Sequence, residues 1–346
     1  MPRLRAFVGL VGCGYWGRNL ARNLHQMGRL AAVCDSDPDV LKGLRAEYPG
    51  LRVERRFERL LERSDVRAVA IAAPAAQHFD LVRRALAAGK DIFVEKPLAL
   101  HVGEAEELVA VAQRTKRVLM VGHILEYHPA ILKLKELVAA GELGEVHYLY
   151  SNRANLGKVR REENILWSFA PHDISVILLL LGVLPETAQT SGQHYLQHDV
   201  ADVTLTFLSF PGKARAHVFV SWLHPFKEQK LVVIGSRKMA VFDDVVKEGK
   251  LRLFDKGIEW KNGLPVIRQT AESTLFFPES EPLREELQHF VECVETRRAP
   301  RTDGHSGLRV LRVLDACQRS LEAGGVPVSL ATAERTPQRA HRARRG

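Results

Sequence analysis

The stretch AFVGLVGCGYWGRNLARNL, residues 6–24, decides the fold of the first half of this 346-residue chain. Its apolar start, residues 6–12, predicts a buried strand, and the spacing of its leucines predicts a helix. Gly12 permits the tight turn between them, Gly14 lets a pyrophosphate approach the backbone, and Gly17 lets the helix pack closely on the strand. Together they predict a dinucleotide-binding unit, because the first N–H groups of such a helix attract phosphate.

An acid at the end of the next predicted strand, residues 30–35, bears on the choice of cofactor. The Asp35 carboxylate has the geometry to accept both ribose hydroxyls of NAD, and it would repel the 2′-phosphate of NADP. No arginine follows it in CDSDPD. We therefore predict NAD rather than NADP, with Tyr15 and Trp16 of the glycine loop as further cofactor contacts. The alternative is that Asp35 only caps the following helix.

Residues 1–122 alternate short apolar runs with amphipathic helices, which predicts an α/β domain with a doubly wound parallel sheet of the Rossmann type. The predicted strands are 6–12, 30–35, 67–73, 91–96 and 118–122, and the helices after the first are 38–48, 78–89 and 104–114. We expect this domain to bind NAD.

Residues 123–330 follow another pattern, in which successive β-runs are joined by short loops. This predicts an α+β domain with a large, open, mostly antiparallel sheet for substrate binding and oligomerisation. Its predicted strands are 145–154, 202–210, 214–223, 229–236 and 238–244, and its helices are 129–141, 174–182, 281–297 and 305–323. Two of these strands are too apolar for a solvated face. We expect a homodimer or homotetramer, the alternative being that the terminal helices cover that face.

Charge and cysteine usage exclude several classes of protein. The net charge is +9, but five arginines and one glutamate in residues 334–346 supply +4 of it, and residues 331–346 are predicted to be a disordered basic tail. The remainder is too dispersed for a nucleic-acid partner. The four cysteines lack metal-ligand spacing, so we expect no metal. The absence of 18 consecutive apolar residues argues against a membrane span, and we expect a cytoplasmic protein.

A second motif, Glu95-Lys96-Pro97, follows the predicted strand 91–96. Ligands of parallel sheets bind at the carboxyl ends of the strands. Lys96 is therefore expected beside the nicotinamide and the alcohol to be oxidised, with Glu95 orienting or tuning it. The alternative for a lysine taken alone is a solvated side chain.

These motifs in this order resemble the Gfo/Idh/MocA oxidoreductases, the family of glucose–fructose oxidoreductase and inositol dehydrogenase. The resemblance is carried by VGCGYWG (11–17), AAPAAQH (72–78), VEKPLAL (94–100) and PHDISVILLLLG (171–182). It implies an NAD-dependent enzyme acting on CH–OH groups. It further implies that Lys96 is catalytic and that Glu95, Pro74 and His78 lie along the cofactor.

Many members of this family carry Asp-x-x-x-His at the start of the apolar helix. His172 matches the histidine, whereas Ser168 stands where the aspartate is expected. The resemblance implies that hydride moves to NAD while Lys96 and His172 handle the proton, with Asp173 orienting the ring. The alternative is that His172 and Asp173 only cap a helix after Pro171.

Residues 151–160 and 163–175 resemble the members that oxidise the C3 hydroxyl of UDP-N-acetylglucosamine or its uronic acid. The sugar or nucleotide-sugar substrate is then expected to contact cations, amides and a flat ring, namely Arg153, Lys158, Arg160, Arg161, Asn155, Asn164 and Trp167, with Ser168, His172 and Asp173. The alternatives are an inositol or free-aldose dehydrogenase of the same family, and a non-catalytic NAD-binding regulatory protein.

Overall fold

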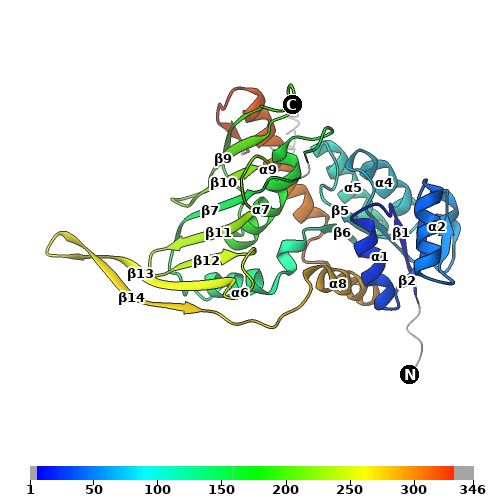
Figure 1. Ribbon diagram of the computed structural model, residues 1–346, viewed down its shortest axis with the longest axis horizontal. Helices are drawn as coiled ribbons and strands as arrows, with labels where there is room; N and C mark the ends of the chain where they lie inside the picture. The colour runs from blue at the N-terminus through cyan, green and yellow to red at the C-terminus, as the bar shows by residue number, and fades with distance from the viewer. Residues whose placement is uncertain (1–5, 158, 331–346) are drawn as a thin grey trace, which may run out of the picture.

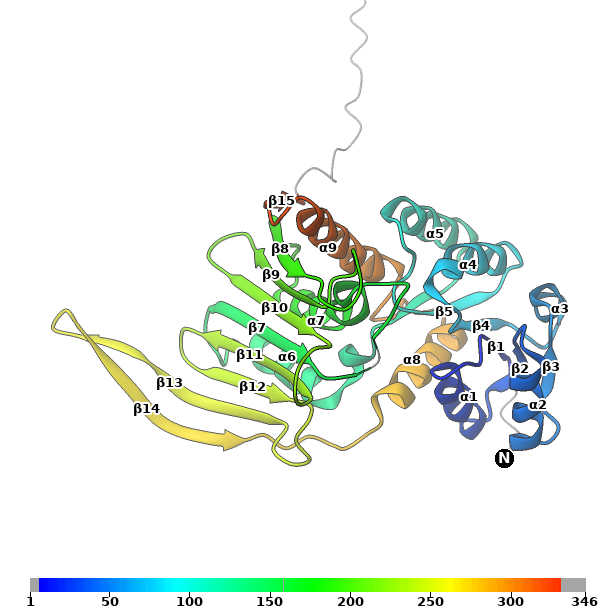
Figure 2. The ribbon, with the colours of Figure 1, turned by 45° about the horizontal axis from the view of Figure 1, so that its top comes forward.

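The first part of the chain forms a six-stranded parallel sheet between two layers of helices (Figures 1 and 2). The computed structural model describes residues 6–157 and 159–330. The strand order is β3-β2-β1-β4-β5-β6, and every neighbouring pair is parallel, which confirms the predicted doubly wound sheet. The strands are β1 (Val8–Val11), β2 (Leu30–Cys34), β3 (Arg52–Glu54), β4 (Ala68–Ile71), β5 (Asp91–Glu95) and β6 (Leu119–Gly122).

Each face of this sheet is buried under its own set of helices. The helices are α1 (Gly17–Gln26), α2 (Pro38–Glu47), α3 (Phe57–Glu62), α4 (His78–Ala87) and α5 (Val102–Thr115). Alternate residues of β5 face opposite cores: Ile92 and Val94 lie in one cluster, and Phe93 lies in the other. Because both faces are covered, the strands are apolar throughout, as parallel strands usually are.

The second part forms a nine-stranded sheet in the order β14-β13-β12-β11-β7-β10-β9-β8-β15. Among the described strands of this sheet, only the pair β7–β10 is parallel, so the predicted mostly antiparallel sheet is confirmed. The strands are β7 (Val146–Ala154), β8 (Thr187–Gln193), β9 (Val203–Ser209), β10 (Arg215–Ser221), β11 (Glu228–Gly235), β12 (Met239–Asp243), β13 (Leu251–Lys261), β14 (Leu264–Thr274) and β15 (Val328–Ser329).

Helices α6 (Pro129–Ala139), α7 (Ile165–Leu181) and α9 (Gly304–Glu322) lie on the side of this sheet that faces the first domain (Figure 2). The short helical turn η2 (Ile124–Tyr127) joins β6 to α6. The apolar helix predicted at 174–182 is longer than expected and begins at Ile165. Pro171 therefore lies inside the helix, so His172 and Asp173 do not cap its start. The cap is Asn164, whose side chain accepts a hydrogen bond from the Trp167 N–H.

The C-terminal helices return to the first domain. Helix α8 (Pro282–Thr296) buries Leu283, Leu287 and Phe290 in the core beside α1, and α9 packs against α5 as well as α7. The predicted boundary after residue 122 lies at the end of β6, and α8 of the predicted second domain packs on the core of the first. An amphipathic pattern shows that a helix covers a core without showing which one.

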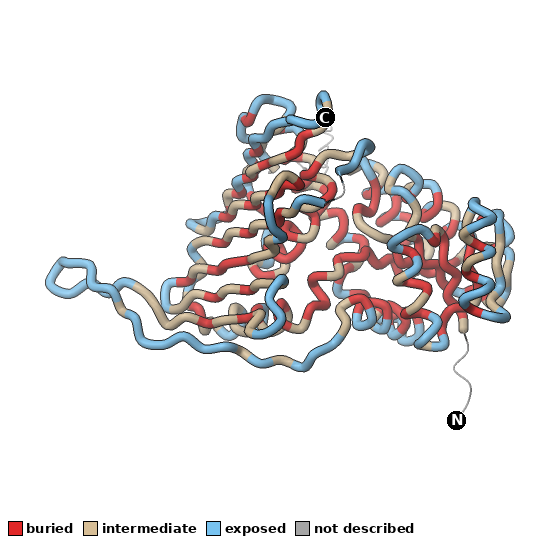
Figure 3. Tube along the Cα trace, in the orientation of Figure 1, coloured by how far each residue is buried: buried red, intermediate tan, exposed pale blue. Residues whose placement is uncertain are grey.

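Strands β13 and β14 form a hairpin that projects far from the sheet (Figures 1 and 3). The sequence analysis did not predict it, because its outer half is exposed on both faces and lacks one-sided alternation. Its turn is Asn262-Gly263, with φ of 52° and 77°, a pair that favours tight hairpins. This signal was present in the sequence. Elements β3, α3, β8 and β15 were also missed.

The predicted basic tail, residues 331–346, lies outside the described residues. Within the described ranges, no helix is both long enough and apolar enough to cross a bilayer.

Candidate functional site

The glycine loop after β1 has the shape that a dinucleotide needs. Gly12 has a φ of 81°, and a Cβ there would lie 2.7 Å from the backbone of Ala73. A Cβ on Gly17 would collide with the carbonyl oxygen of Gly12, so the start of α1 packs directly on the turn. Above Gly14, by contrast, nothing lies within 4 Å of the Cβ position. The loop thus leaves an open cradle at a helix N-terminus, where a pyrophosphate fits.

Asp35 lies at the end of β2, beside this cradle. Its carboxylate accepts hydrogen bonds from the backbone N–H of Cys13 at 2.7 Å and of Asp37 at 3.0 Å. It therefore holds the glycine loop against the second strand. The side chain is partly exposed, so its remaining lone pairs stay open to a ribose.

Trp16 connects the glycine loop to the end of β5. Its indole N–H donates a hydrogen bond of 2.5 Å to Oε1 of Glu95 at the end of β5. Tyr15 beside it is 91% exposed. Trp16 and Glu95 are thus in contact at the carboxyl ends of β1 and β5, and Tyr15 precedes Trp16 in the glycine loop.

Lys96 reaches across the junction between the two domains. Its Nζ donates a hydrogen bond of 3.0 Å to the carbonyl oxygen of Ser168 on α7. Burial lowers the pKa of Lys96, partly opposed by the nearby carboxylate of Glu163. His172 lies one turn further along α7. The structure therefore brings Lys96, Ser168 and His172 together, and it is the serine carbonyl rather than an acidic side chain that holds the lysine.

His123 is a residue of this site that the sequence analysis missed. It directly follows Gly122, which pairs with Glu95 on the neighbouring strand, so it stands beside the lysine. Its side chain is 2% exposed, and neither ring nitrogen has a hydrogen-bond partner among the described residues. Nδ1 of His172 is likewise buried without a partner. Its place at the carboxyl end of a predicted strand was the signal that could have identified it.

The two imidazoles are held in their neutral form. Burial lowers the pKa of His123 to about 3, with a further contribution from the charge of Lys96. Burial also lowers the pKa of His172 well below its ordinary value, and Lys96 and Arg153 act in the same direction. Unpaired buried nitrogens are unusual, and they are explained when a polar ligand fills the space between them.

Asp173 does not orient the ring of His172. Its carboxylate accepts a hydrogen bond of 2.6 Å from the Ser151 hydroxyl and one of 2.9 Å from Nε of Arg153. Asp173 and Arg153 are both buried, so each neutralises the other. We therefore assign them to the framework that joins α7 to β7.

Two other substrate candidates also connect elements. Both the Asn164 amide and the Trp167 indole donate hydrogen bonds of 2.9 Å to Oε1 of Gln318 on α9. The Trp167 ring packs against the cores of both domains. Asn155 differs, because its Oδ1 is buried without a partner. Arg160 is exposed and pairs with Glu163 at 3.1 Å, while Lys158 lies outside the described residues.

His78 is buried between the loops that follow β4 and β5. It is 1% exposed, and its ring nitrogens lie 2.7 Å and 2.9 Å from the carbonyl oxygens of Pro97 and Ala73. It thereby joins the loop after β4 to the loop after β5. Pro74, in the first of these loops, is exposed toward solvent. Of this pair, only Pro74 is free to contact a cofactor directly.

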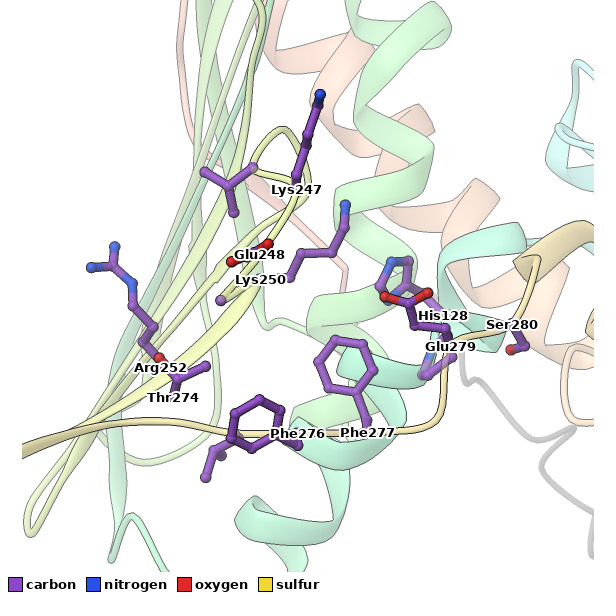
Figure 4. Close-up of a pocket in the computed structure, with 14 residues that line it drawn as sticks. His128, Lys247, Glu248, Lys250, Arg252, Thr274, Phe276, Phe277, Glu279 and Ser280 are labelled. Atoms are coloured by element: carbon purple, nitrogen blue, oxygen red, sulfur yellow. The ribbon is translucent and has the colours of Figure 1, made fainter.

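A cavity of about 1090 Å³ lies elsewhere, at the base of the β13–β14 hairpin (Figure 4). Its walls include His128, Lys250, Arg252, Phe276 and Phe277. Lys250 is bonded to Asp244 at 2.9 Å and Arg252 to Glu272 at 3.2 Å, so these cations are already paired. The cavity contains neither Lys96 nor the glycine loop, and we assign the chemistry to the domain junction. The described residues hold no cluster of three or more metal-ligating side chains.

Comparison with known proteins places both halves of the chain in one family. Residues 7–123 match the family model described as an oxidoreductase family with an NAD-binding Rossmann fold. Residues 131–241 match the model described as the GFO/IDH/MocA C-terminal domain.

Three relatives cover nearly all of the chain. UDP-N-acetylglucosamine 3-dehydrogenase of Acidithiobacillus ferrooxidans is 27% identical over 91% of this chain and 97% of that protein. A solved structure of it gives a TM-score of 0.81 at 26% identity, covering 92% of this chain and 97% of that one. The scyllo-inositol 2-dehydrogenase (NAD(+)) of Bacillus subtilis is 28% identical over 94% and 95%. GenD2 from gentamicin A biosynthesis, solved in complex with NAD, gives a TM-score of 0.80 at 25% identity over 94% and 96%.

Proposed function

Because the chain belongs to the Gfo/Idh/MocA family of NAD-binding oxidoreductases, we propose that it oxidises the C3 hydroxyl of a UDP-linked amino sugar with NAD. The observation that carries the catalytic part is the contact between Lys96, directly after β5, and Ser168 on α7, one helical turn from His172. It brings two groups able to handle a proton to the mouth of the dinucleotide site. The relatives that act on sugar hydroxyls support the reaction class.

Lys96 is the proton acceptor in this proposal. Burial lowers the pKa of His123 and His172, so neither ring readily takes up a proton. Burial also lowers the pKa of Lys96 below its ordinary value, so its amine becomes neutral more readily than that of a solvated lysine. The substrate hydroxyl gives its proton to the neutral amine, and the neutral His172 ring hydrogen-bonds the same oxygen. Bound NAD supplies the hydride acceptor. The carbonyl of Ser168 keeps the amine in place before the substrate arrives.

His123 and Asn155 are the hydroxyl-binding groups in this proposal. Each has buried polar atoms with no partner in the described part of the chain. A sugar hydroxyl both donates and accepts, so it satisfies either an imidazole nitrogen or an amide oxygen. A substrate lacking the matching hydroxyl would leave these atoms unpaired, which costs about 1–3 kcal/mol for each one.

The nucleotide-sugar substrate draws its support from the relative in Acidithiobacillus ferrooxidans, which spans 91% of this chain. Inositol is the second candidate, because the Bacillus subtilis relative spans 94% of the chain at similar identity. A panel of UDP-N-acetylglucosamine, its uronic acid, inositol and free aldoses, followed by the absorbance of NADH, separates them. We expect the kcat/KM of the UDP-sugars to exceed that of inositol by about 100-fold or more. A higher value for inositol overturns the substrate assignment.

Asp35 supports NAD rather than NADP as the cofactor. It ends β2 beside the glycine loop, where a 2′-phosphate would meet its negative charge. Asp35→Asn removes the charge and keeps the size of the side chain. We expect it to weaken NADH binding by about tenfold and to narrow the preference for NADH over NADPH, as measured by fluorescence titration of both reduced cofactors.

A second copy of this chain is the partner that we propose, in a homodimer or homotetramer located in the cytoplasm. The face of the large sheet opposite α7 carries a ring cluster, in which Tyr150 stacks on His217 at 5.2 Å and Phe207 lies 5.9 Å from His217. The terminal helices pack elsewhere, so they do not cover this face. Burial of such a face between subunits fits its composition.

A further inference from the structure

Helix α8 runs antiparallel to β5, the strand that ends at the catalytic motif. At the start of the strand, Nη1 of Arg297 lies 2.7 Å from Oδ2 of Asp91. Two residues further on, the rings of Phe93 and Phe290 are 5.8 Å apart. In these two pairs the residue number rises along β5 while it falls along α8. Each step toward the catalytic end of β5 is therefore a step toward the N-terminus of α8.

The next pair along this register consists of two carboxyl groups. Glu95 lies two residues after Phe93, so it shares that face of the strand. Glu286 lies one helical turn before Phe290 and is buried on the same side of α8. Gly122 on β6 makes room for the Glu95 carboxyl, because a Cβ there would lie 2.9 Å from its Oε2. This register puts Glu286 on the side of α8 toward Glu95, and the negative charge of Glu95 acts on Glu286.

Glu286 has no donor within reach. Its side chain is 1% exposed, and neither carboxyl oxygen has a hydrogen-bond partner among the described residues. A buried carboxylate without a donor is strongly unfavourable, whereas a protonated carboxyl is itself a donor. Burial, together with the negative charges of Glu95 on β5 and Glu126 on η2, raises the pKa of Glu286 well above its ordinary value. The protonated form is thus the one that fits this position.

We propose that Glu286 is a positioning residue for Lys96, and that it donates its proton in a hydrogen bond to the carboxylate of Glu95. Glu95 is then held from two sides, by the Trp16 indole of the glycine loop and by Glu286 of α8. Glu95 lies next to Lys96, and burial raises its own pKa to about 7. In its charged form it raises the pKa of Lys96, as Glu163 does, whereas Arg160 and Arg153 lower it. By favouring the charged form of Glu95, Glu286 raises the pH at which the amine becomes neutral. This role rests on the proposed function of Lys96.

Two substitutions separate the hydrogen bond from simple packing. Glu286→Gln keeps a neutral donor, so we expect the pH profile of kcat to stay as in the wild type. Glu286→Leu fills the same space without a donor, so Glu95 gives up its charge more readily. The pKa of Lys96 then falls, and the acid limb of the oxidation profile moves to lower pH by about one unit. Thermal stability is not expected to fall, because a buried acid is replaced by an apolar side chain.

Infrared spectroscopy tests the proton directly and needs no substrate. At pH 7 the wild-type protein should show the C=O stretch of a protonated carboxyl that is lost in Glu286→Gln and kept in Glu285→Gln, a change at an exposed position on the same helix. Glu126 is present in every sample, so its signal cancels in the difference. The absence of a lost band overturns the proposal, even if sugars are oxidised. A lost band without turnover on any sugar leaves the carboxyl pair standing and instead rejects the proposed function.

Discussion

At the scale of single residues, the site contains ionisable side chains that are buried away from water, and the imidazoles among them have ring nitrogens without a hydrogen-bond partner in the described part of the chain. Lys96, His123 and His172 meet at the domain junction, and burial lowers the pKa of all three. Two neighbouring cations would repel one another there, so the cluster favours one proton at most. A single base with two neutral hydrogen-bonding rings suits the transfer of one hydroxyl proton.

Glu126 offers a test of burial as the cause of these shifts. It is 3% exposed, and burial raises its pKa from 4.5 to about 8. Between these two pH values the folded protein keeps a proton on Glu126 that the unfolded chain has lost. The free energy of unfolding is therefore not reduced by Glu126 below pH 4.5, and it falls progressively as the pH rises to about 8. In Glu126→Gln the penalty is absent. From about pH 5 to about pH 8 the variant should gain up to about 4 kcal/mol over the wild type in urea unfolding. Equal pH dependence in both proteins would rule out the shift.

Residue chemistry was predictable from sequence only where the local motif fixed the geometry. Gly12, Gly17 and Asp35 lie where strand, turn and helix must place them. Arg153 and Asp173 were expected at the substrate, but they form a buried pair because β7 and α7 cross there. A contact between residues far apart in the sequence is set by packing, and no local spacing reveals it.

At the scale of elements, the start of α7 decides which polar side chains remain for the substrate. Asn164 caps the helix and contacts Gln318, whereas Oδ1 of Asn155 has no partner within the described ranges. Asn164→Ala should lower the free energy of unfolding by about 1 kcal/mol and change KM little. Asn155→Ala should do the opposite, raising KM with no loss of stability. Thermal melts and steady-state kinetics on both variants check this contrast, and a raised KM in Asn164→Ala alone would reverse the assignment.

The elements themselves were predictable to different degrees. The buried parallel strands have apolar runs between turn signals, and their existence follows from that pattern. The start of α7 was predicted too late in the chain, because a proline such as Pro171 is common at the first position of a helix. In fact the helix continues through it, since its N-terminal turn is capped by Asn164 and packed on α9. Tertiary contacts thus outweighed the local preference.

At the scale of the whole molecule, the inner half of β13 pairs with β12, whereas the outer half of the β13–β14 hairpin is exposed. Ile258 and Ile267 are directly paired across it, and Trp260 lies on the same face. Trp260 is 72% exposed and Ile267 is 73% exposed. A two-stranded hairpin with an apolar face is marginal alone in water, so we expect this face to pack on a second subunit.

The combination Trp260→Ser and Ile267→Thr should therefore shift the assembly to smaller species in analytical ultracentrifugation. NAD binding per subunit should persist, since the glycine loop lies in the other domain. Glu259→Gln, in the same hairpin, serves as the matched control and should leave the assembly unchanged. A wild-type protein that sediments as a monomer would contradict the expectation for the hairpin.

The variant Lys96→Met tests most directly whether Lys96 accepts the proton in an NAD-dependent oxidation. NADH formation is measured under saturating NAD with the best substrate of the panel, alongside NAD affinity by fluorescence. We predict that kcat falls by a factor of about 100 or more, the scale of a lost acid–base group, while NAD affinity changes by less than about threefold. A methionine variant that turns over at the wild-type rate would contradict the assignment.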